Sequence, residues 1–191
     1  MNGFENLMTD TPNLPIRTNK VLETERCLLR YPSHDDAPTM LTAFTSAKFP
    51  KDLPLGLITS LTEVHNWINR CQTGWANGSM VSWVVDLKHD HTLVGQVTLA
   101  LLDEPDKWSL AYWIHPNHWG QSYATEASNE VLKYGTEKLN AATFWAGTAE
   151  WNTSSSRVLE KLGMQHVSDS PQGYNIKGKP IPTKEYELTL P

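Results

Sequence analysis

The residues with the clearest chemical potential lie in a turn that has no bulky aliphatic side chain. Gly120, Ser122 and Ala124 recur at every second position of Trp119–Ala124, and a helical pattern begins at Ser122. The first N–H groups of a helix have no partner inside it and carry a partial positive charge, so small residues there let them bind an anion such as phosphate. We expect this turn to bind a diphosphate, and a plain strand-to-helix connector is the alternative.

The two elements that flank this turn are expected to hold it in place. Lys107–Ile114 alternates apolar and polar residues like a strand, and Ser122–Leu139 repeats its apolar residues at the spacing of a helix. Ala127 and Val131 lie on the apolar side of that helix, which would pack it on the sheet. A turn fixed at both ends would keep its N–H groups in one arrangement.

Patterns along the rest of the chain predict a single α/β domain. Ser33 with Asp36, and Ser60 with Glu63, have the spacing of capping boxes, so a helix should follow each pair. Four-residue turns at Lys88–His91 and Asp103–Asp106 predict an antiparallel meander, and the order is β-α-α-β-β-β-α-β-α-β-β. The expected strands are Val21–Pro32, Ser79–Leu87, Thr92–Leu102, Lys107–Ile114, Thr143–Ala149, Met164–Asp169 and Pro182–Leu190, and the expected helices are Asp35–Thr45, Leu61–Trp75, Ser122–Leu139 and Ser154–Leu162.

Composition and charge exclude several classes of protein. The 191 residues are 39% hydrophobic and 19% charged, as in an ordinary globular domain, which we expect over residues 21–191 after a flexible arm over residues 1–20. The net charge of −5 and the lack of a Lys/Arg cluster argue against nucleic acid as a partner. No apolar run approaches the length of a membrane span, so we expect no membrane partner.

Cysteine, histidine and tryptophan add weaker indications. Cys27 and Cys71 form neither a disulfide framework nor a metal spacing, which favours buried thiols in a reducing cytoplasm. His89 and His91 lie in a hairpin turn and are not expected to bind metal. The eight tryptophans suggest either an aromatic-lined groove or, as we favour, filling of the core.

Four segments together resemble one known family. The segment from Tyr112 to Ala127, YWIHPNHWGQSYATEA, is similar to motif A of the GNAT superfamily of N-acetyltransferases, R/Q-x-x-G-x-G/A followed by a helix. It is most similar to the branch of the ribosomal-protein-alanine N-acetyltransferases, which usually has W-G-x-G-Y-A-T-E-A. Three further segments resemble the same branch: ETERCLLR (Glu23–Arg30), LVGQVTL (Leu93–Leu99) and WNTSSSRVLEKLGM (Trp151–Met164).

The resemblance implies a splayed, mixed and mostly antiparallel sheet with helices on both faces, and acetyl-coenzyme A held between two central strands. It implies that the diphosphate binds at Gln121–Ala124, that the strand end at Ile114 meets the pantetheine, and that Asn152 contacts the coenzyme arm. Ser155 matches the serine proposed in this branch to protonate the departing thiolate. The implied coenzyme-binding residues are Ile114, Trp119, Gly120, Gln121, Ser122, Tyr123, Ala124 and Asn152.

The chain departs from the family pattern at the turn itself. Ser122 replaces the second glycine, where glycine allows a close approach or an unusual φ, and Trp119 replaces the leading Arg or Gln. Ser155 also has a simpler interpretation, since the serines Ser154–Ser156 at a helix start could cap that helix. Ser122 and the lack of an assigned general base keep a second function open, a non-catalytic acyl-coenzyme A-binding or regulatory module.

The expected function is an acetyl-coenzyme A-dependent N-acetyltransferase with direct attack by a primary amine, either a protein N-terminus or a small molecule. We expect it to be a monomer or homodimer, and the acidic net charge would suit a cationic acceptor. His115 and His118 are candidate bases, although capping or surface roles are favoured for both. Asp103 and Glu104 are expected to be solvated, and Tyr112 to be a core residue rather than part of the acceptor slot. A longer acyl donor remains open.

Overall fold

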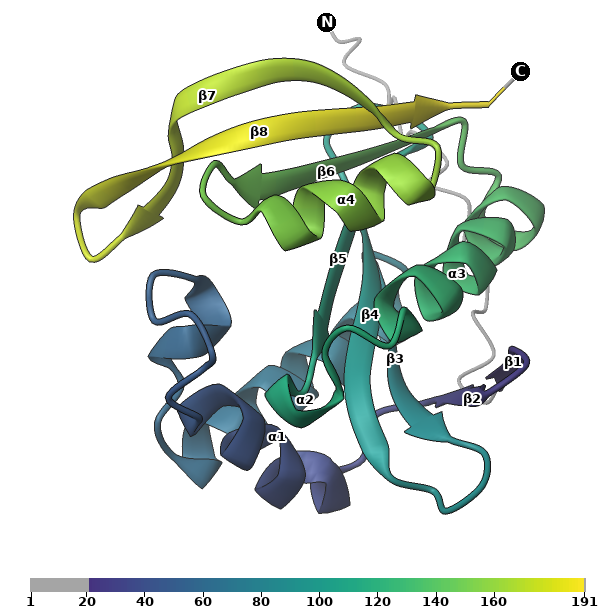
Figure 1. Ribbon diagram of the computed structural model, residues 1–191. Coiled ribbons are helices and arrows are strands. Elements are labelled where there is room, and N and C mark those ends of the chain that lie inside the picture. The colour runs from purple at the N-terminus through teal and green to yellow at the C-terminus, as the bar shows by residue number, and fades with distance from the viewer. Residues whose placement is uncertain (1–20, 191) are drawn as a thin grey trace, which may run out of the picture.

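The computed structural model describes residues 21–190, so the arm expected over residues 1–20 lies outside the described chain (Figure 1). The strands are β1 (Leu22–Glu23), β2 (Cys27–Arg30), β3 (Met80–Leu87), β4 (Leu93–Leu101), β5 (Lys107–Ile114), β6 (Thr143–Ala149), β7 (Gln165–Ile176) and β8 (Lys179–Thr189). The helices are α1 (Ala37–Thr45), α2 (Leu61–Asn77), α3 (Tyr123–Leu139) and α4 (Thr153–Lys161), with 3-10 turns η1 (His34–Asp36), η2 (Pro54–Leu57) and η3 (Pro116–His118).

Within the described residues the strands form one 8-stranded sheet in the order β1-β2-β3-β4-β5-β6-β8-β7. All neighbouring strands are antiparallel except β5 and β6, which are parallel. Neighbouring residues of β3 face opposite layers: Val84 packs with α1 and α2, whereas Val85 packs in the cluster that includes α3 and α4. The predicted fold class, a mixed and mostly antiparallel sheet with helices on both faces, is confirmed.

The predicted capping boxes are both present. Ser60 Oγ accepts a hydrogen bond from the Glu63 N–H at 3.3 Å, and Glu63 Oε2 accepts from the Ser60 N–H at 3.0 Å. Ser33 and Asp36 form the equivalent pair at the start of η1, which leads directly into α1. The capping box at Ser60 starts α2 at Leu61, as predicted. The helix expected from Asp35 begins later, because the first capping box starts η1 and α1 follows only from Ala37.

The single first strand expected over Val21–Pro32 is wrong. It is divided into β1 and β2 because Thr24 closes a tight turn onto Cys27, with its N–H donating to the Cys27 carbonyl at 3.0 Å. The Thr24 hydroxyl also accepts from the Cys27 N–H at 2.9 Å. At the other end of the chain, β7 continues past the expected limit of Asp169 to Ile176, and register shifts absorb its irregular residues.

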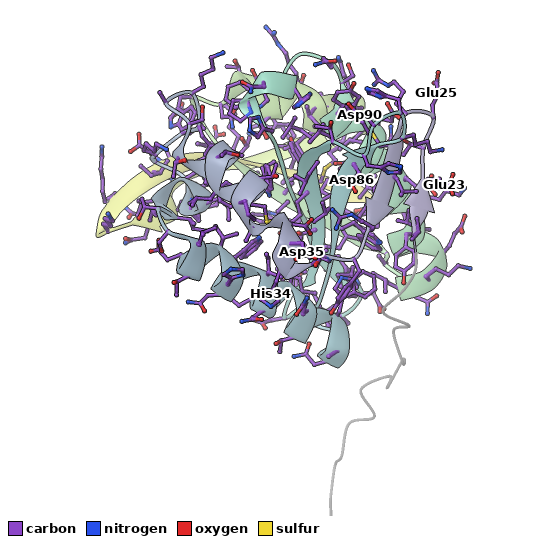
Figure 2. The ribbon with its side chains drawn as sticks, turned by 90° about the horizontal axis from the view of Figure 1, so that it is seen from below. Glu23, Glu25, His34, Asp35, Asp86 and Asp90 are labelled. Atoms are coloured by element: carbon purple, nitrogen blue, oxygen red, sulfur yellow. The ribbon has the colours of Figure 1, made fainter. Side chains whose placement is uncertain are left out.

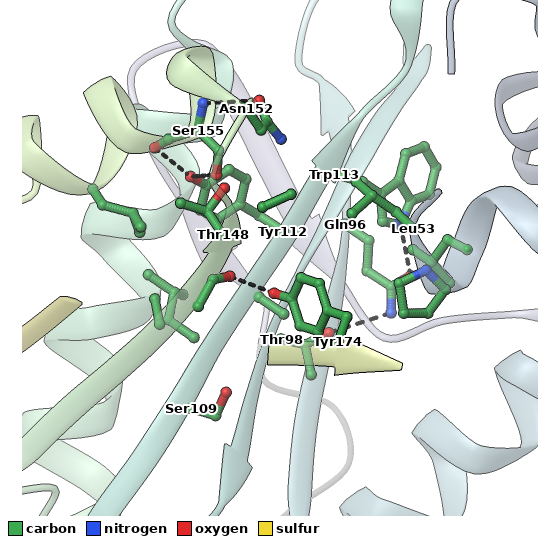
Figure 3. Close-up of a pocket in the computed structure, with 18 of the residues that line it drawn as sticks. Leu53, Gln96, Thr98, Ser109, Tyr112, Trp113, Thr148, Asn152, Ser155 and Tyr174 are labelled. Carbon is green, nitrogen blue, oxygen red and sulfur yellow. Dashed lines mark hydrogen bonds between the residues drawn. The ribbon is translucent and has the colours of Figure 1, made fainter. Parts of the chain in front are cut away.

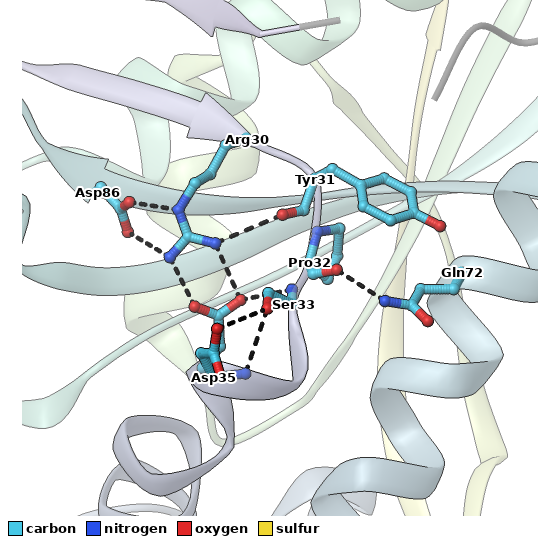
Figure 4. Close-up of polar contacts among 8 residues, drawn as sticks. Arg30, Tyr31, Pro32, Ser33, Asp35, Gln72 and Asp86 are labelled. Carbon is cyan, nitrogen blue, oxygen red and sulfur yellow. Dashed lines mark hydrogen bonds and ion pairs between the residues drawn. The ribbon is translucent and has the colours of Figure 1, made fainter. Parts of the chain in front are cut away.

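An ion-pair network ties the first helical layer to the sheet (Figure 4). Arg30 of β2 contacts Asp36 at 2.6 Å and Asp86 of β3 at 2.6 Å. Hydrogen bonds to Asp36 raise the pKa of Arg30, against the opposing effect of burial, so the guanidinium stays charged. The network fixes the start of α1, and with it the chain that continues into η2 and α2.

Candidate active site

The turn before α3 has the open geometry that an anion site requires. Gly120 and Ser122 both have left-handed backbones, with φ of 77° and 65°. Ser122 is the N-cap of α3, but no side chain caps the helix start. A Cβ at Gly120 would meet no atom within 4 Å. The N–H groups at this helix start are therefore left for a ligand, which fits the donor set that a diphosphate needs.

A charged network from the first strands holds this turn. Arg26 Nη2 donates to the Gln121 carbonyl at 3.0 Å, and its Nε donates to Glu126 Oε2 at 2.7 Å. The guanidinium lies 4.5 Å from the centre of the Tyr123 ring. The Thr24 hydroxyl also donates to Glu126. Burial works to raise the pKa of Glu126, but the hydrogen bonds from Thr24 and Arg26 outweigh it and lower that pKa, so Glu126 is ionised at neutral pH.

The side chain of Trp119 contacts the main chain at the end of β5. Its indole N–H donates to the Ile114 carbonyl at 2.7 Å, while 47% of the residue remains exposed. The Ile114 carbonyl, expected to meet the pantetheine, thus already accepts one hydrogen bond from within the chain. Trp119, the first residue of the turn, is therefore bound directly to the end of β5.

The sheet opens between the two central parallel strands. β5 and β6 pair only at Lys107–Ser109 with Thr143–Trp145, and they separate beyond those residues. A cavity of about 340 Å³ lies at this separation. It is lined from seven elements and the loop after α1, by Phe49, Leu53, Pro54, Leu55, Trp67, Gln96, Thr98, Ser109, Leu110, Ala111, Tyr112, Trp113, Trp145, Ala146, Gly147, Thr148, Ala149, Asn152, Ser155, Leu159 and Tyr174.

Ser155, Asn152 and Tyr112 meet on one side of this cavity (Figure 3). The Tyr112 and Ser155 hydroxyl oxygens are 2.7 Å apart, and the Tyr112 hydroxyl also lies 3.1 Å from the Ser155 carbonyl. Asn152 Oδ1 accepts from the Ser155 N–H at 3.2 Å and so caps α4. Asn152, rather than the hydroxyl of Ser155, is therefore the cap, and the Ser155 hydroxyl faces Tyr112.

Tyr112 differs from the core residue that the sequence suggested. It packs at the edge of the core, but its hydroxyl reaches the cavity and Ser155. Burial raises the pKa of Tyr112, and the hydrogen bond between its hydroxyl and that of Ser155 offsets only part of that shift. Tyr112 therefore keeps its proton throughout the neutral range.

Within residues 21–190, no histidine, aspartate or glutamate lines the cavity. His115 Nδ1 accepts from the Asn117 N–H at 3.2 Å, which is the capping role favoured from the sequence, and burial lowers the pKa of His115. Asp103 and Glu104 are exposed, as expected, and Glu104 pairs with Lys107 at 3.0 Å. The structure supplies no side-chain base at the cavity from among these candidates.

Sequence reasoning missed the wall opposite Ser155. Gln96, Trp67 and Trp113 lie there on three different elements, and Gln96 Oε1 accepts from both indole N–H groups, at 3.0 Å and 3.1 Å. The abundance of tryptophan was the available signal. Both interpretations of the tryptophans hold. Trp75 and Trp83 are core residues, whereas Trp67, Trp113 and Trp145 line the cavity.

The described residues contain neither a metal-binding cluster nor a membrane-spanning helix. In that part of the chain no three His, Cys, Asp or Glu side chains lie together as a metal site, the hairpin with His89 and His91 included. No helix between residues 21 and 190 is long and apolar enough to cross a bilayer.

Comparison with known proteins agrees with this geometry. The model of the acetyltransferase (GNAT) domain matches residues 26–165, so the chain belongs to that family. YoaA, an uncharacterized N-acetyltransferase of Bacillus subtilis, is 24% identical over 172 residues, which are 90% of this chain and 97% of that relative. Acetyl transfer from acetyl-coenzyme A to an amine is accordingly the reaction class, and acetyl-coenzyme A is the acetyl donor.

Two solved structures share the whole fold. RimJ of Mycobacterium smegmatis, in complex with CoA-disulfide, has a TM-score of 0.78 at 16% identity and covers 91% of this chain and 88% of its own. The ribosomal-protein-S5-alanine acetyltransferase of Vibrio fischeri has a TM-score of 0.74 at 16% identity, covering 90% and 97%. At this identity the two neighbours show that the fold is shared.

Proposed function

We propose that acetyl-coenzyme A lies with its diphosphate on the N–H groups of Gln121–Ala124 and its thioester in the cavity between β5 and β6, where a primary amine attacks it directly. In this arrangement Gly120, Trp119 and Tyr123 shape the diphosphate site, and Ile114 and Asn152 flank the coenzyme arm. The domain spans residues 21–191. The observation that carries the proposal is the contact between Tyr112 and Ser155 in the cavity where the two strands separate.

Ser155 is assigned the protonation of the leaving sulfur. As the nitrogen–carbon bond forms and the carbon–sulfur bond breaks, Ser155 gives its hydroxyl proton to the sulfur and regains the proton that the attacking nitrogen loses. Tyr112 stays protonated and holds the Ser155 oxygen in position, which its raised pKa supports. The side chains therefore end the cycle unchanged, and no acyl-enzyme forms.

The acceptor amine is proposed to arrive without its extra proton. Of the described residues that line the cavity, none is a carboxylate or an imidazole that could remove it. Water at the cavity mouth takes this proton before the amine enters. Catalysis then rests mainly on positioning the two reactants, with Ser155 supplying the proton transfer.

We further propose a cytoplasmic location and an acceptor that is a peptide or a small amine. Cys27 and Cys71 are buried free thiols, which supports a reducing compartment such as the cytoplasm. The acidic net charge of −5 supports an acceptor other than nucleic acid, either a peptide N-terminus or a small amine. We propose that the protein works as a monomer or homodimer.

Release of free thiol from acetyl-coenzyme A, measured against a panel of primary amines, tests the proposal. We expect amine-dependent thiol release together with an acetylated product identified by mass. Tight coenzyme binding with no acetylation of any amine would instead identify the alternative, a non-catalytic acyl-coenzyme A-binding module, which the left-handed Ser122 in place of glycine keeps in consideration.

A further inference from the structure

The cavity has two chemically different sides (Figure 3). Asn152, Ser155 and Tyr112 gather on the side that the proposed function assigns to the thioester. Leu53 and Trp113 lie on the opposite side, which is left for the acceptor. Trp67 lies beside Trp113, since both bind Gln96. Among the other large side chains that line the cavity are Phe49, Leu55, Trp145 and Tyr174.

The polar atoms of the large side chains at this wall already have hydrogen-bond partners within the protein. The indole N–H groups of Trp67 and Trp113 both donate to Gln96 Oε1, and Gln96 Nε2 donates to Cys71 Sγ at 3.3 Å. The Tyr174 hydroxyl donates to the Gly147 carbonyl. These side chains consequently offer an entering molecule their carbon surfaces rather than free donors and acceptors.

The acceptor side also carries no formal charge. No Asp, Glu, His, Lys or Arg is present among the described residues that line the cavity. The net charge of −5 arises elsewhere, for instance from Glu23, Glu25 and Asp90, which are exposed on the outer surface (Figure 2). A charged group enters an apolar site only at a high cost unless it is paired there. The acidic character of the whole chain therefore gives no support to a cationic acceptor at this site.

We infer that the amine-bearing end of the acceptor carries an uncharged apolar or aromatic group. This group packs against the wall formed by Trp67, Trp113, Trp145 and Tyr174. This inference rests on the proposed function and names its substrate class. Polyamines, and amines with a carboxylate or a second cation beside the reacting nitrogen, are poor acceptors. The source is either a small arylalkylamine or a peptide whose first residue is apolar, since both present the same chemistry to the wall.

Matched acceptors test the inference. We expect kcat/KM for norleucine amide to exceed that for arginine amide at least tenfold, and phenethylamine to exceed spermidine by a similar factor. The kcat/KM for a peptide that begins with Phe, compared with that for phenethylamine, distinguishes the peptide source from the small-molecule source. Equal or better acetylation of the cationic member of each pair would overturn the inference and leave the proposed function intact, whereas no acetylation of any amine would overturn both.

A substitution at Leu53 sharpens the test. Leu53→Asp places a carboxylate on the acceptor side, and Leu53→Asn is a control of the same shape without the charge. We expect Leu53→Asp alone to shift the ratio of apolar to cationic acceptors at least tenfold toward the cationic amine, with coenzyme affinity unchanged. A ratio that changes equally in both variants would contradict an uncharged wall as the source of selectivity. If Leu53→Asp fails to bind coenzyme, the matched acceptor pairs measured on the unaltered protein decide whether the inference holds.

Discussion

The two ends of the proposed active site are built from different materials. At the coenzyme end, the ligand would meet backbone N–H groups of one short turn, which Arg26 and Glu126 hold from behind. At the acceptor end, the ligand would meet side chains brought together from the loop after α1 and several other elements. A main-chain site depends on local geometry and small residues, whereas a side-chain site depends on tertiary packing. Changes at the two ends should therefore have separable effects.

The largest expected effect is at the turn. Gly120→Asp adds a carboxylate where a Cβ has open space, and a like charge about 5 Å from a diphosphate should weaken coenzyme binding on the order of 100-fold. Gly120→Asn is the control, because Asn has the same shape and tolerates the left-handed backbone nearly as well as Asp. Calorimetry with coenzyme A measures both, and equal loss in the two variants would show that backbone strain, not charge, is responsible.

A substitution at the thioester should affect turnover and spare binding. We expect Ser155→Ala to lower kcat about 100-fold, as for loss of one proton-transfer group, with less than about a threefold change in coenzyme affinity. Tyr112→Phe should lower kcat less, about tenfold, because Tyr112 only positions Ser155. A Ser155→Ala protein with unaltered kcat and reduced thermal stability would instead make Ser155 a purely structural residue.

A weaker effect is expected behind the turn, at Arg26. Removing this side chain in Arg26→Ala frees the Gln121 carbonyl and Glu126, so the KM for acetyl-coenzyme A should rise about tenfold while kcat changes little. Lys133→Ala, an exposed cation further along α3, is the matched control and should leave KM unchanged. If kcat falls as KM rises in Arg26→Ala, the role of Arg26 lies in folding rather than in positioning the turn.

The smallest effect should come from Ser122→Gly, which restores the family's glycine at a left-handed position. Relief of backbone strain at φ 65° should stabilise the fold by about 1 kcal/mol, a rise in Tm of roughly 2–4 °C. Asn140→Gly relieves a similar conformation (φ 53°) at the other end of α3 and serves as the control. Only Ser122→Gly should also alter coenzyme affinity. Equal coenzyme affinity in the two variants would show that Ser122 is not part of the coenzyme site.

The same contrast explains what the sequence could predict. Helix starts and the proposed phosphate turn are local, so short spacings predict them: Ser60 with Glu63 for the start of α2, and Gly120 with Ser122 for the turn. The side-chain wall is not local, because Trp67 and Trp113 become neighbours only through Gln96. The break between β1 and β2 was missed for a similar reason.

The tight turn at that break also contacts α3, far along the sequence. Thr24 and Arg26 leave the strand ladder and bind Glu126 instead, so the segment ETER and the segment YATEA form one structure. The spacing of apolar residues within Val21–Pro32 does not indicate a contact with a residue on another element. Resemblance to a family indicated that both segments matter, and the structure supplies the physical link between them.

A crystal structure of the protein with acetyl-coenzyme A and norleucine amide tests the central claim most directly. The account predicts the diphosphate on the N–H groups of Gln121–Ala124, the sulfur within hydrogen-bonding reach of the Ser155 hydroxyl, and the butyl chain against Trp67 and Trp113. A diphosphate bound away from this turn, or a sulfur remote from Ser155, would contradict it.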